Sequence, residues 1–199
     1  MIKTITFDFG GVLYHYDGEV LLTELSRKSD LSPDLYRELL GSSSLDKAHF
    51  RGEINAEELL EILKEKAGLS MTVEELADAY ANSVRPNEDM FDLVRELEED
   101  YNIQLYSDTP EILYHRVMRE MPIFDAFSAI TLSYEVGELK DSPEGHEDMI
   151  TKSGRDPEEI IFIDDREEFV SKAKELGING IRFKNFNHLL EDLARHGVK

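Results

Sequence analysis

Five short apolar runs along the chain predict the strands of one sheet. They are Ile2–Phe9, Ile103–Tyr106, Ala129–Leu132, Ile160–Ile163 and Ile178–Phe183. The fourth run is apolar throughout, which is typical of a strand covered on both faces. Apolar residues at helical spacing predict the core helices Glu88–Asp100, Pro110–Glu120, Pro143–Lys152, Glu167–Leu176 and Phe186–Arg195. This alternation predicts an α/β protein with a Rossmann-like, parallel five-stranded sheet.

The long segment between the first and second runs has helical periodicity instead. It predicts helices at Glu19–Lys28, Pro33–Leu40, Asp46–Arg51, Ala56–Lys66 and Val73–Asn82. Asn55 and Thr72 indicate helix starts, because each is followed by an acidic first turn. The simplest arrangement is a helical cap domain, residues 16–86, inserted into an α/β core domain formed by residues 1–15 and 87–199.

Composition narrows the class of protein. The 199 residues include 22 Lys+Arg and 43 Asp+Glu, for a net charge of −21, which argues against a nucleic-acid partner. There is no cysteine, which excludes a disulfide scaffold, a zinc ribbon and a thiol nucleophile. No apolar run approaches the ~18 residues of a membrane span, and the strand-like start lacks the pattern of a secretory signal. We therefore expect a cytoplasmic protein without a membrane partner.

The acidity itself has two interpretations. Carboxylates are spread from Asp8 to Asp192, so no single acidic tail accounts for the charge. They form an ordinary solvated surface, or they reflect adaptation to a high-salt cytoplasm, where a short Debye length weakens their mutual repulsion. The sequence does not indicate an oligomeric state.

Polar residues gather where the predicted parallel strands end. After the first four strands, in chain order, come Asp8, Ser107 with Asp108, Lys140, and Asp164 with Asp165. Ligands bind at this edge of an open parallel sheet. Four aspartates there would repel one another unless a cation joined them, and ligands that are all oxygen atoms favour Mg²⁺. The Lys140 ammonium and the Ser107 hydroxyl suit a phosphate, so the sequence predicts a phosphate-and-metal site.

A single aspartate after a strand often serves only as a helix cap or turn former. The complete set, in this order, resembles the four motifs of the haloacid dehalogenase superfamily of phosphatases, and the resemblance covers nearly the whole chain. A cap between the first motif and the second core strand fits one subgroup of that superfamily. Phe50–Ile54 and Gly137–Lys140 are similar to its sugar-phosphate phosphatases, of the α-glucose-1-phosphate type.

The resemblance implies a nucleophile and a metal site. Asp8 would attack phosphorus and form an aspartyl-phosphate, which a carboxylate does without first losing a proton. Mg²⁺ would bind the carboxylates of Asp8 and Asp165 and the carbonyl of Gly10. Asp164 would be a more distant or water-mediated partner of the metal.

The resemblance also implies a phosphate site. The Ser107 hydroxyl and the backbone N–H of Asp108 would bind phosphoryl oxygens. Lys140 would neutralise the charge shared by the nucleophile and the phosphoryl group.

Three positions depart from the family pattern. Gly10 stands where an aspartate usually protonates the leaving oxygen and activates water, and losing such a group typically costs about 10²–10⁴-fold in rate. An anomeric or acyl phosphate would lose less, and the similar sugar-phosphate phosphatases also tolerate glycine here. Asp108 stands where asparagine is usual, and its charge could weaken phosphate binding. Phe169 replaces a usual asparagine, which we interpret as a packing change.

Two further residues are candidates for substrate contact. His15 follows the first motif near the expected cap entrance; it could contact substrate, replace the missing acid, or be a simple hinge residue. Arg51, at the end of a cap helix, could hold a substrate carboxylate or hydroxyl, or form an ion pair on the cap surface.

Three functions remain open at this point. The first is a Mg²⁺-dependent phosphatase of a small phosphorylated metabolite, such as a sugar phosphate. The second is a catalytically weak or inactive binding protein of the same fold, which Gly10 and Asp108 favour. The third is a carbon–halogen hydrolase, which has no need of Mg²⁺; the pair of Asp164 and Asp165 argues against it.

Overall fold

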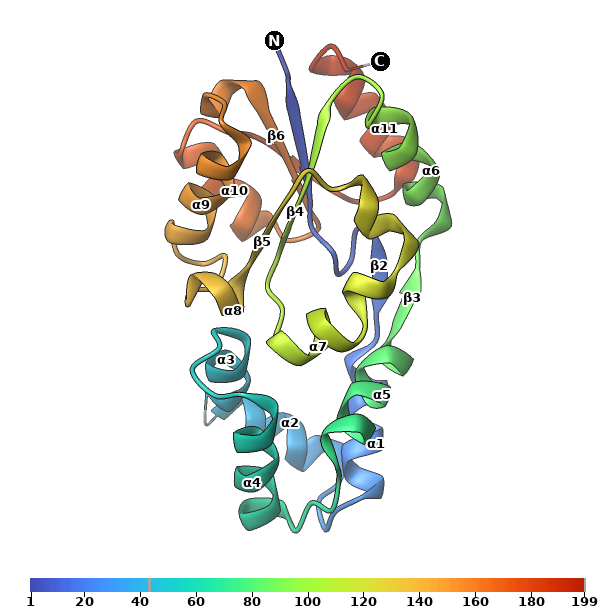
Figure 1. Cartoon of the computed structure of the whole chain (residues 1–199), viewed down its shortest axis with the longest axis vertical. Helices are drawn as coiled ribbons and strands as arrows, with labels where there is room; N and C mark the ends of the chain where they lie inside the picture. Colours follow the sequence, from blue (N-terminus) through green and yellow to red (C-terminus); the bar gives the residue numbers. More distant parts are fainter. Residues whose placement is uncertain (43, 199) are drawn as a thin grey trace.

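A five-stranded parallel sheet forms the centre of the larger lobe (Figure 1). The computed structural model describes the chain except residues 43 and 199. The strand order is β5-β4-β1-β6-β7, and every neighbouring pair is parallel. The strands are β1 (Thr4–Phe7), β4 (Asn102–Ser107), β5 (Ala129–Leu132), β6 (Ile160–Asp164) and β7 (Asn179–Arg182). The predicted α/β class and Rossmann-like sheet are confirmed.

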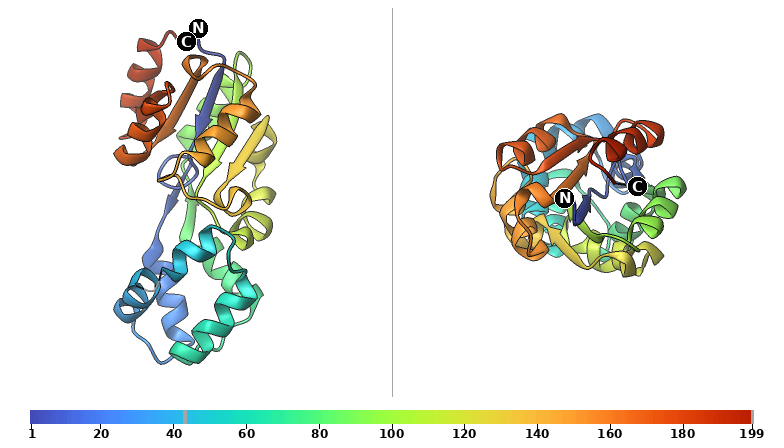
Figure 2. Two further views of the ribbon diagram at one scale, coloured as in Figure 1. Left: turned by 90° about the vertical axis from the view of Figure 1, so that its left-hand side faces the viewer. Right: turned by 90° about the horizontal axis from the view of Figure 1, so that it is seen from above.

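Helices cover both faces of this sheet. Two lie on one face, α9 (Glu144–Ser153) and α10 (Glu167–Glu175), and two on the other, α6 (Glu88–Leu97) and α11 (Phe186–Arg195) (Figures 1 and 2). β1 and β6 are buried along their whole lengths; β6 is apolar up to Asp164, whereas β1 alternates Thr4 and Thr6 with Ile5 and Phe7. A parallel sheet covered in this way exposes its carboxyl edge, and that edge faces the second lobe.

The second lobe, here called the helical lobe, comprises residues 18–83. Its helices are α1 (Gly18–Arg27), α2 (Pro33–Ser42), α3 (Leu45–Phe50), α4 (Ala56–Ala67) and α5 (Val73–Ser83). Capping boxes begin α4 and α5. The side chains of Asn55 and Thr72 accept hydrogen bonds from the backbone N–H groups of Glu58 and Glu75, and the carboxylates of these glutamates accept from the backbone N–H groups of Asn55 and Thr72. A two-stranded antiparallel sheet, β2 (Tyr14–Tyr16) and β3 (Val84–Pro86), joins this lobe to the sheet lobe (Figure 1).

Two parts of the sheet lobe differ from the elements that the sequence predicted. The predicted helix Pro110–Glu120 is broken: α7 covers only Glu111–Arg116, because Val117 leaves the helical region with φ −129° and ψ −63°. Short 3₁₀ helices follow at Met118–Glu120 and Pro122–Ala126, and another lies at Pro157–Glu159. The one-turn helix α8 (Ser133–Val136) was not predicted. Among the described residues, no helix is long and apolar enough to cross a membrane.

Candidate active site

Asp8 stands at the carboxyl end of the central strand. Its backbone N–H continues the sheet by donating to the Ile163 carbonyl (2.9 Å), so the register of β1 against β6 sets Asp8 beside Asp164. Asp8 Oδ1 accepts from the Phe9 N–H at 2.7 Å and lies 2.6 Å from Lys140 Nζ. The side chain is buried, and its carboxylate faces the edge where ligands bind in such sheets.

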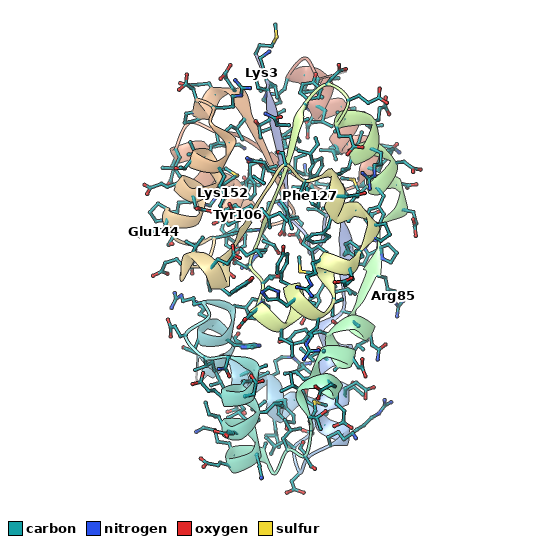
Figure 3. All side chains as sticks on the ribbon, viewed as in Figure 1. Lys3, Arg85, Tyr106, Phe127, Glu144 and Lys152 are labelled. Atoms are coloured by element: carbon teal, nitrogen blue, oxygen red, sulfur yellow. The ribbon has the colours of Figure 1, made fainter. Side chains whose placement is uncertain are left out.

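Lys140 contacts residues at the carboxyl ends of three strands, β1, β4 and β6. Its buried ammonium lies 2.6 Å from Asp8 Oδ1 and 2.7 Å from Asp164 Oδ2, and its backbone N–H donates to Asp108 Oδ1 at 3.0 Å. The Tyr106 ring, in the interior of the sheet lobe (Figure 3), lies 5.3 Å from Nζ. The surrounding carboxylates raise the pKa of Lys140 against the opposing effect of burial, so the ammonium stays charged.

Negative charge exceeds positive charge at this edge. Asp8, Asp164 and Asp165 offer carboxylate oxygens that all lie within 4.8 Å of one another. Burial raises the pKa of Asp8 to about 8, an effect that Lys140 opposes and Asp164 reinforces, and burial also raises the pKa of Asp165. One ammonium cannot balance three carboxylates, and a cluster of oxygen ligands fits a hard divalent cation such as Mg²⁺.

Gly10 and Gly11, in the loop after β1, differ in whether the structure leaves room for a side chain. Gly11 adopts φ +79°, and a Cβ there would lie 2.5 Å from Asp165 Oδ2, so only glycine fits. Gly10 lies outside the left-handed region, and the nearest described atom to a Cβ there would be Tyr16 Cβ, at 3.9 Å. Sequence reasoning used Gly10 and missed the steric role of Gly11, although a Gly-Gly pair after a strand signals a close approach.

A cavity of about 420 Å³, here called the carboxylate cavity, opens between the two lobes. Most of the predicted site residues line it: Asp8, Gly10, His15, Ser107, Asp108, Lys140 and Asp165. Asp164 does not line the cavity; it is fully buried, and its Oδ1 accepts from the Arg166 N–H at 2.9 Å. Arg51 also lies outside the lining, with its Nε 3.3 Å from Glu138 Oε2 on the sheet lobe.

Three further residues of the cavity wall come from other elements. Tyr16 belongs to β2, Phe50 ends α3, and Thr109 follows β4. The Phe50 carbonyl accepts from Ser133 Oγ at 2.6 Å, and Ser133 Oγ in turn accepts from the Thr109 N–H at 2.8 Å. These bonds hold the end of α3 against the sheet lobe, at the side of the cavity.

Comparison with known proteins identifies a family. The sequence model of the haloacid dehalogenase-like hydrolases matches residues 2–177. The chain is 27% identical to the D-ribitol-5-phosphate phosphatase of Bacteroides thetaiotaomicron, across 93% of each chain. It is 28% identical to the sesquiterpene phosphatase astK of Aspergillus oryzae, across 96% of this chain and 92% of the relative.

The fold is also found in a solved structure with ligands. A haloacid dehalogenase family enzyme from Bacteroides thetaiotaomicron, a wild-type protein in complex with magnesium and inorganic phosphate, superposes with a TM-score of 0.82. The two sequences are 27% identical, and the match covers 95% of this chain and 99% of that one.

Proposed function

The chain belongs to the haloacid dehalogenase-like hydrolases, and from that membership we propose that it is a Mg²⁺-dependent phosphatase of a small phosphorylated metabolite. The observation that carries the proposal is the cluster around Lys140. In it the Asp8 carboxylate, at the end of β1, faces a cavity that the Ser107 hydroxyl also lines, and the nearby carboxylates outnumber the single ammonium. The relatives named as phosphatases support the same reaction class.

Asp8 is the proposed nucleophile. Among the described residues, its hydrogen bonds all involve Oδ1, which leaves Oδ2 for attack on phosphorus. Attack forms the Oδ2–phosphorus bond and breaks the bond from phosphorus to the leaving oxygen, which departs with the electron pair. Water then attacks the phosphorus of the aspartyl-phosphate, which releases inorganic phosphate and restores the carboxylate. Lys140, at 2.6 Å, opposes the effect of burial on the Asp8 carboxylate and holds it in place.

The metal ligands proposed are the carboxylates of Asp8 and Asp165 and the carbonyl of Gly10. The donor set fits Mg²⁺ because it consists of oxygen atoms only, and because the carboxylates carry more charge than Lys140 balances. When bound, the ion supplies positive charge to the phosphoryl oxygens. Asp164 has a different proposed role: bonded to Lys140 Nζ and the Arg166 N–H, it positions the lysine.

The phosphate would be held by groups with spare hydrogen-bonding capacity. Ser107 Oγ has only long contacts, 3.5 Å to the Asp108 carbonyl and 3.4 Å to Thr109 Oγ1, so its hydroxyl is available to a phosphoryl oxygen. The Asp108 carboxylate accepts from the Lys140 N–H, which turns its charge toward the lysine backbone. We propose that Ser107, the Asp108 N–H and Lys140 orient the phosphoryl group.

Gly10 limits the range of substrates. It provides no carboxyl group to protonate a leaving oxygen, so we propose that good substrates are anomeric or acyl phosphates, whose leaving groups need little protonation. His15 lines the carboxylate cavity and is the proposed donor where a proton is needed. Gly10 also favours a second candidate function, a protein of this fold that binds phosphate compounds and hydrolyses them slowly or not at all.

The test is hydrolysis of acetyl phosphate with Mg²⁺ and, separately, with EDTA. We expect turnover that EDTA abolishes and that Asp8→Asn removes, because the amide keeps the shape of the side chain without its attacking charge. Asp156→Asn is the matched control. Asp156 is exposed and does not line the carboxylate cavity, so this variant should keep full activity. Phosphate binding by calorimetry without any turnover would favour the binding protein. Full turnover in EDTA would exclude the metal assignment.

A further inference from the structure

The helical lobe contains a second cavity of about 380 Å³, here called the lobe cavity. Its deep wall is made of buried side chains from α1, α4 and α5, namely Leu21, Leu25, Leu59, Leu63, Leu76 and Tyr80. All five helices of the lobe contribute to its lining, and they lie in a ring in the left view of Figure 2. Charged residues, Arg37 and Asp46, occur only at exposed or partly exposed points of its described lining.

The two cavities are neighbours. Tyr16 and Phe50 line both of them, so the same two aromatic side chains border the carboxylate cavity on one side and the lobe cavity on the other. Tyr16 is 46% exposed, and Phe50 is partly exposed. For a molecule with its phosphate at Asp8, the lobe cavity lies on the other side of these two rings.

The size of the lobe cavity indicates how much can enter it. Protein cores are ordinarily packed without voids of this kind. An apolar cavity of about 150 Å³ is enough to bind benzene. The volume of the lobe cavity is about two and a half times as large as that, which corresponds to a hydrocarbon of roughly a dozen carbon atoms.

One polar atom on the wall lacks a partner. His49 is 2% exposed, and its Nδ1 lies 3.2 Å from the Ile54 carbonyl, so Nδ1 carries the proton and Nε2 is an acceptor. No described group bonds to Nε2. A buried acceptor without a partner is costly, and a hydroxyl on a bound molecule would satisfy it.

We propose that the lobe cavity binds the leaving group of the substrate, and that this group is largely hydrocarbon, with a hydroxyl that donates to His49 Nε2. This proposal rests on the proposed phosphatase function and narrows its substrates to phosphorylated compounds with an extended apolar part. A short polyol chain would leave most of the leucine wall without contacts.

Acyl phosphates of increasing chain length test the proposal, because their leaving groups have nearly the same acidity while their apolar surface grows. From acetyl to butyryl, hexanoyl and octanoyl phosphate, we expect kcat/KM to rise by up to about fourfold per methylene, the value for full burial. Octanoyl phosphate is shorter than the dozen carbon atoms that the cavity accommodates, so the rise should continue through the whole series. Equal kcat/KM across the series would overturn the inference and leave the phosphatase proposal intact; no hydrolysis of any member of the series would overturn the phosphatase proposal itself.

Two leucines of α2 provide a matched pair of variants. Leu40 lines the lobe cavity, whereas Leu35 is 49% exposed and does not. Leu40→Trp should fill part of the cavity and lower kcat/KM for octanoyl phosphate by about tenfold or more, the equivalent of two methylenes, with acetyl phosphate unchanged. Leu35→Trp should change neither. If Leu40→Trp does not fold, as judged by circular dichroism, Leu22→Trp on α1 replaces it.

His49→Leu tests the acceptor. It should lower kcat/KM for octanoyl phosphate with a terminal hydroxyl more than for plain octanoyl phosphate. An equal effect on both compounds would remove His49 from the proposal. An unchanged preference for long chains in Leu40→Trp and Leu22→Trp would overturn the assignment of the lobe cavity.

Discussion

Restoring a carboxyl group at position 10 tests how far the missing acid limits this site. The structure accepts Gly10→Asp, because the backbone there is outside the left-handed region and the nearest described atom to the new Cβ is Tyr16 Cβ at 3.9 Å. The new side chain would enter the carboxylate cavity, which Gly10 and Asp8 both line. Gly10→Asn is the matched control, since it has the same shape without an acidic proton.

The expected gain follows from the two steps of the reaction. A positioned acid/base contributes about 10²–10⁴-fold, and we expect the lower end, about 10²-fold, because a further carboxylate also repels the phosphate. Phosphorylation of the enzyme by glycerol 3-phosphate should gain the full factor, since its alkoxide leaving group needs a proton. Phosphorylation by acetyl phosphate should gain little, but hydrolysis of the phosphoenzyme should accelerate with both substrates.

Rapid-quench kinetics separates these steps. The burst reports enzyme phosphorylation, and the steady state reports the slower of phosphorylation and hydrolysis. Gly10→Asn should resemble the wild type in both. A Gly10→Asp protein that melts at the wild-type temperature, binds Mg²⁺ and turns over no faster than Gly10→Asn would refute the reasoning.

Three other substitutions test the geometry. Gly11→Ala should cost about 1–3 kcal/mol of unfolding free energy, measured in urea, and about 10²-fold in kcat/KM if it displaces Asp165 by an ångström. Ser133→Ala should cost about 1–3 kcal/mol in urea, because the Phe50 carbonyl and the Thr109 N–H lose a buried partner. Burial lowers the pKa of His146 from 6.5 to about 4. Between these two pH values the unfolded chain therefore binds more protons than the folded chain does. The free energy of unfolding should fall by about 3 kcal/mol as the pH drops through this window. His146→Phe should remove that part of the pH dependence.

Two of these substitutions have their own controls. Gly10→Ala adds the same methyl group as Gly11→Ala at an open position and should be nearly neutral; equal losses in the two variants would contradict the steric argument. Ser133→Cys keeps a weak donor and should lose less than Ser133→Ala. An unaltered pH profile of unfolding in His146→Phe would assign that pH dependence to other groups.

The sheet and the site edge were predictable because each depends on a simple local signal. Apolar runs mark buried strands, and parallel topology brings their carboxyl ends, with Asp8 and Asp164, to one edge. The pairing of β1 with β6, which makes these two residues neighbours, is known only from the structure. The pairing of β2 with β3 was not predictable either, because three residues in each strand are too few to establish an alternating pattern.

Long-range packing accounts for what the sequence did not reveal. Arg51 pairs with Glu138 across the two lobes, and no local pattern distinguishes that ion pair from a substrate contact. The leucines of α1, α4 and α5 signal only amphipathic helices. Whether such helices close on one another or leave a space depends on their positions in three dimensions, so the lobe cavity becomes visible only in the structure.

Chemical trapping of the phosphoenzyme tests the central claim, that Asp8 is the nucleophile, most directly. Because Gly10 offers no base to activate water, the aspartyl-phosphate should accumulate during turnover of acetyl phosphate. Borohydride reduces an acyl phosphate to an alcohol, and peptide mass spectrometry then locates the reduced side chain. We expect reduction at residue 8, dependent on Mg²⁺ and absent from Asp8→Asn. Reduction at Asp164 or Asp165, or phosphate release without any reduced carboxylate, would contradict it.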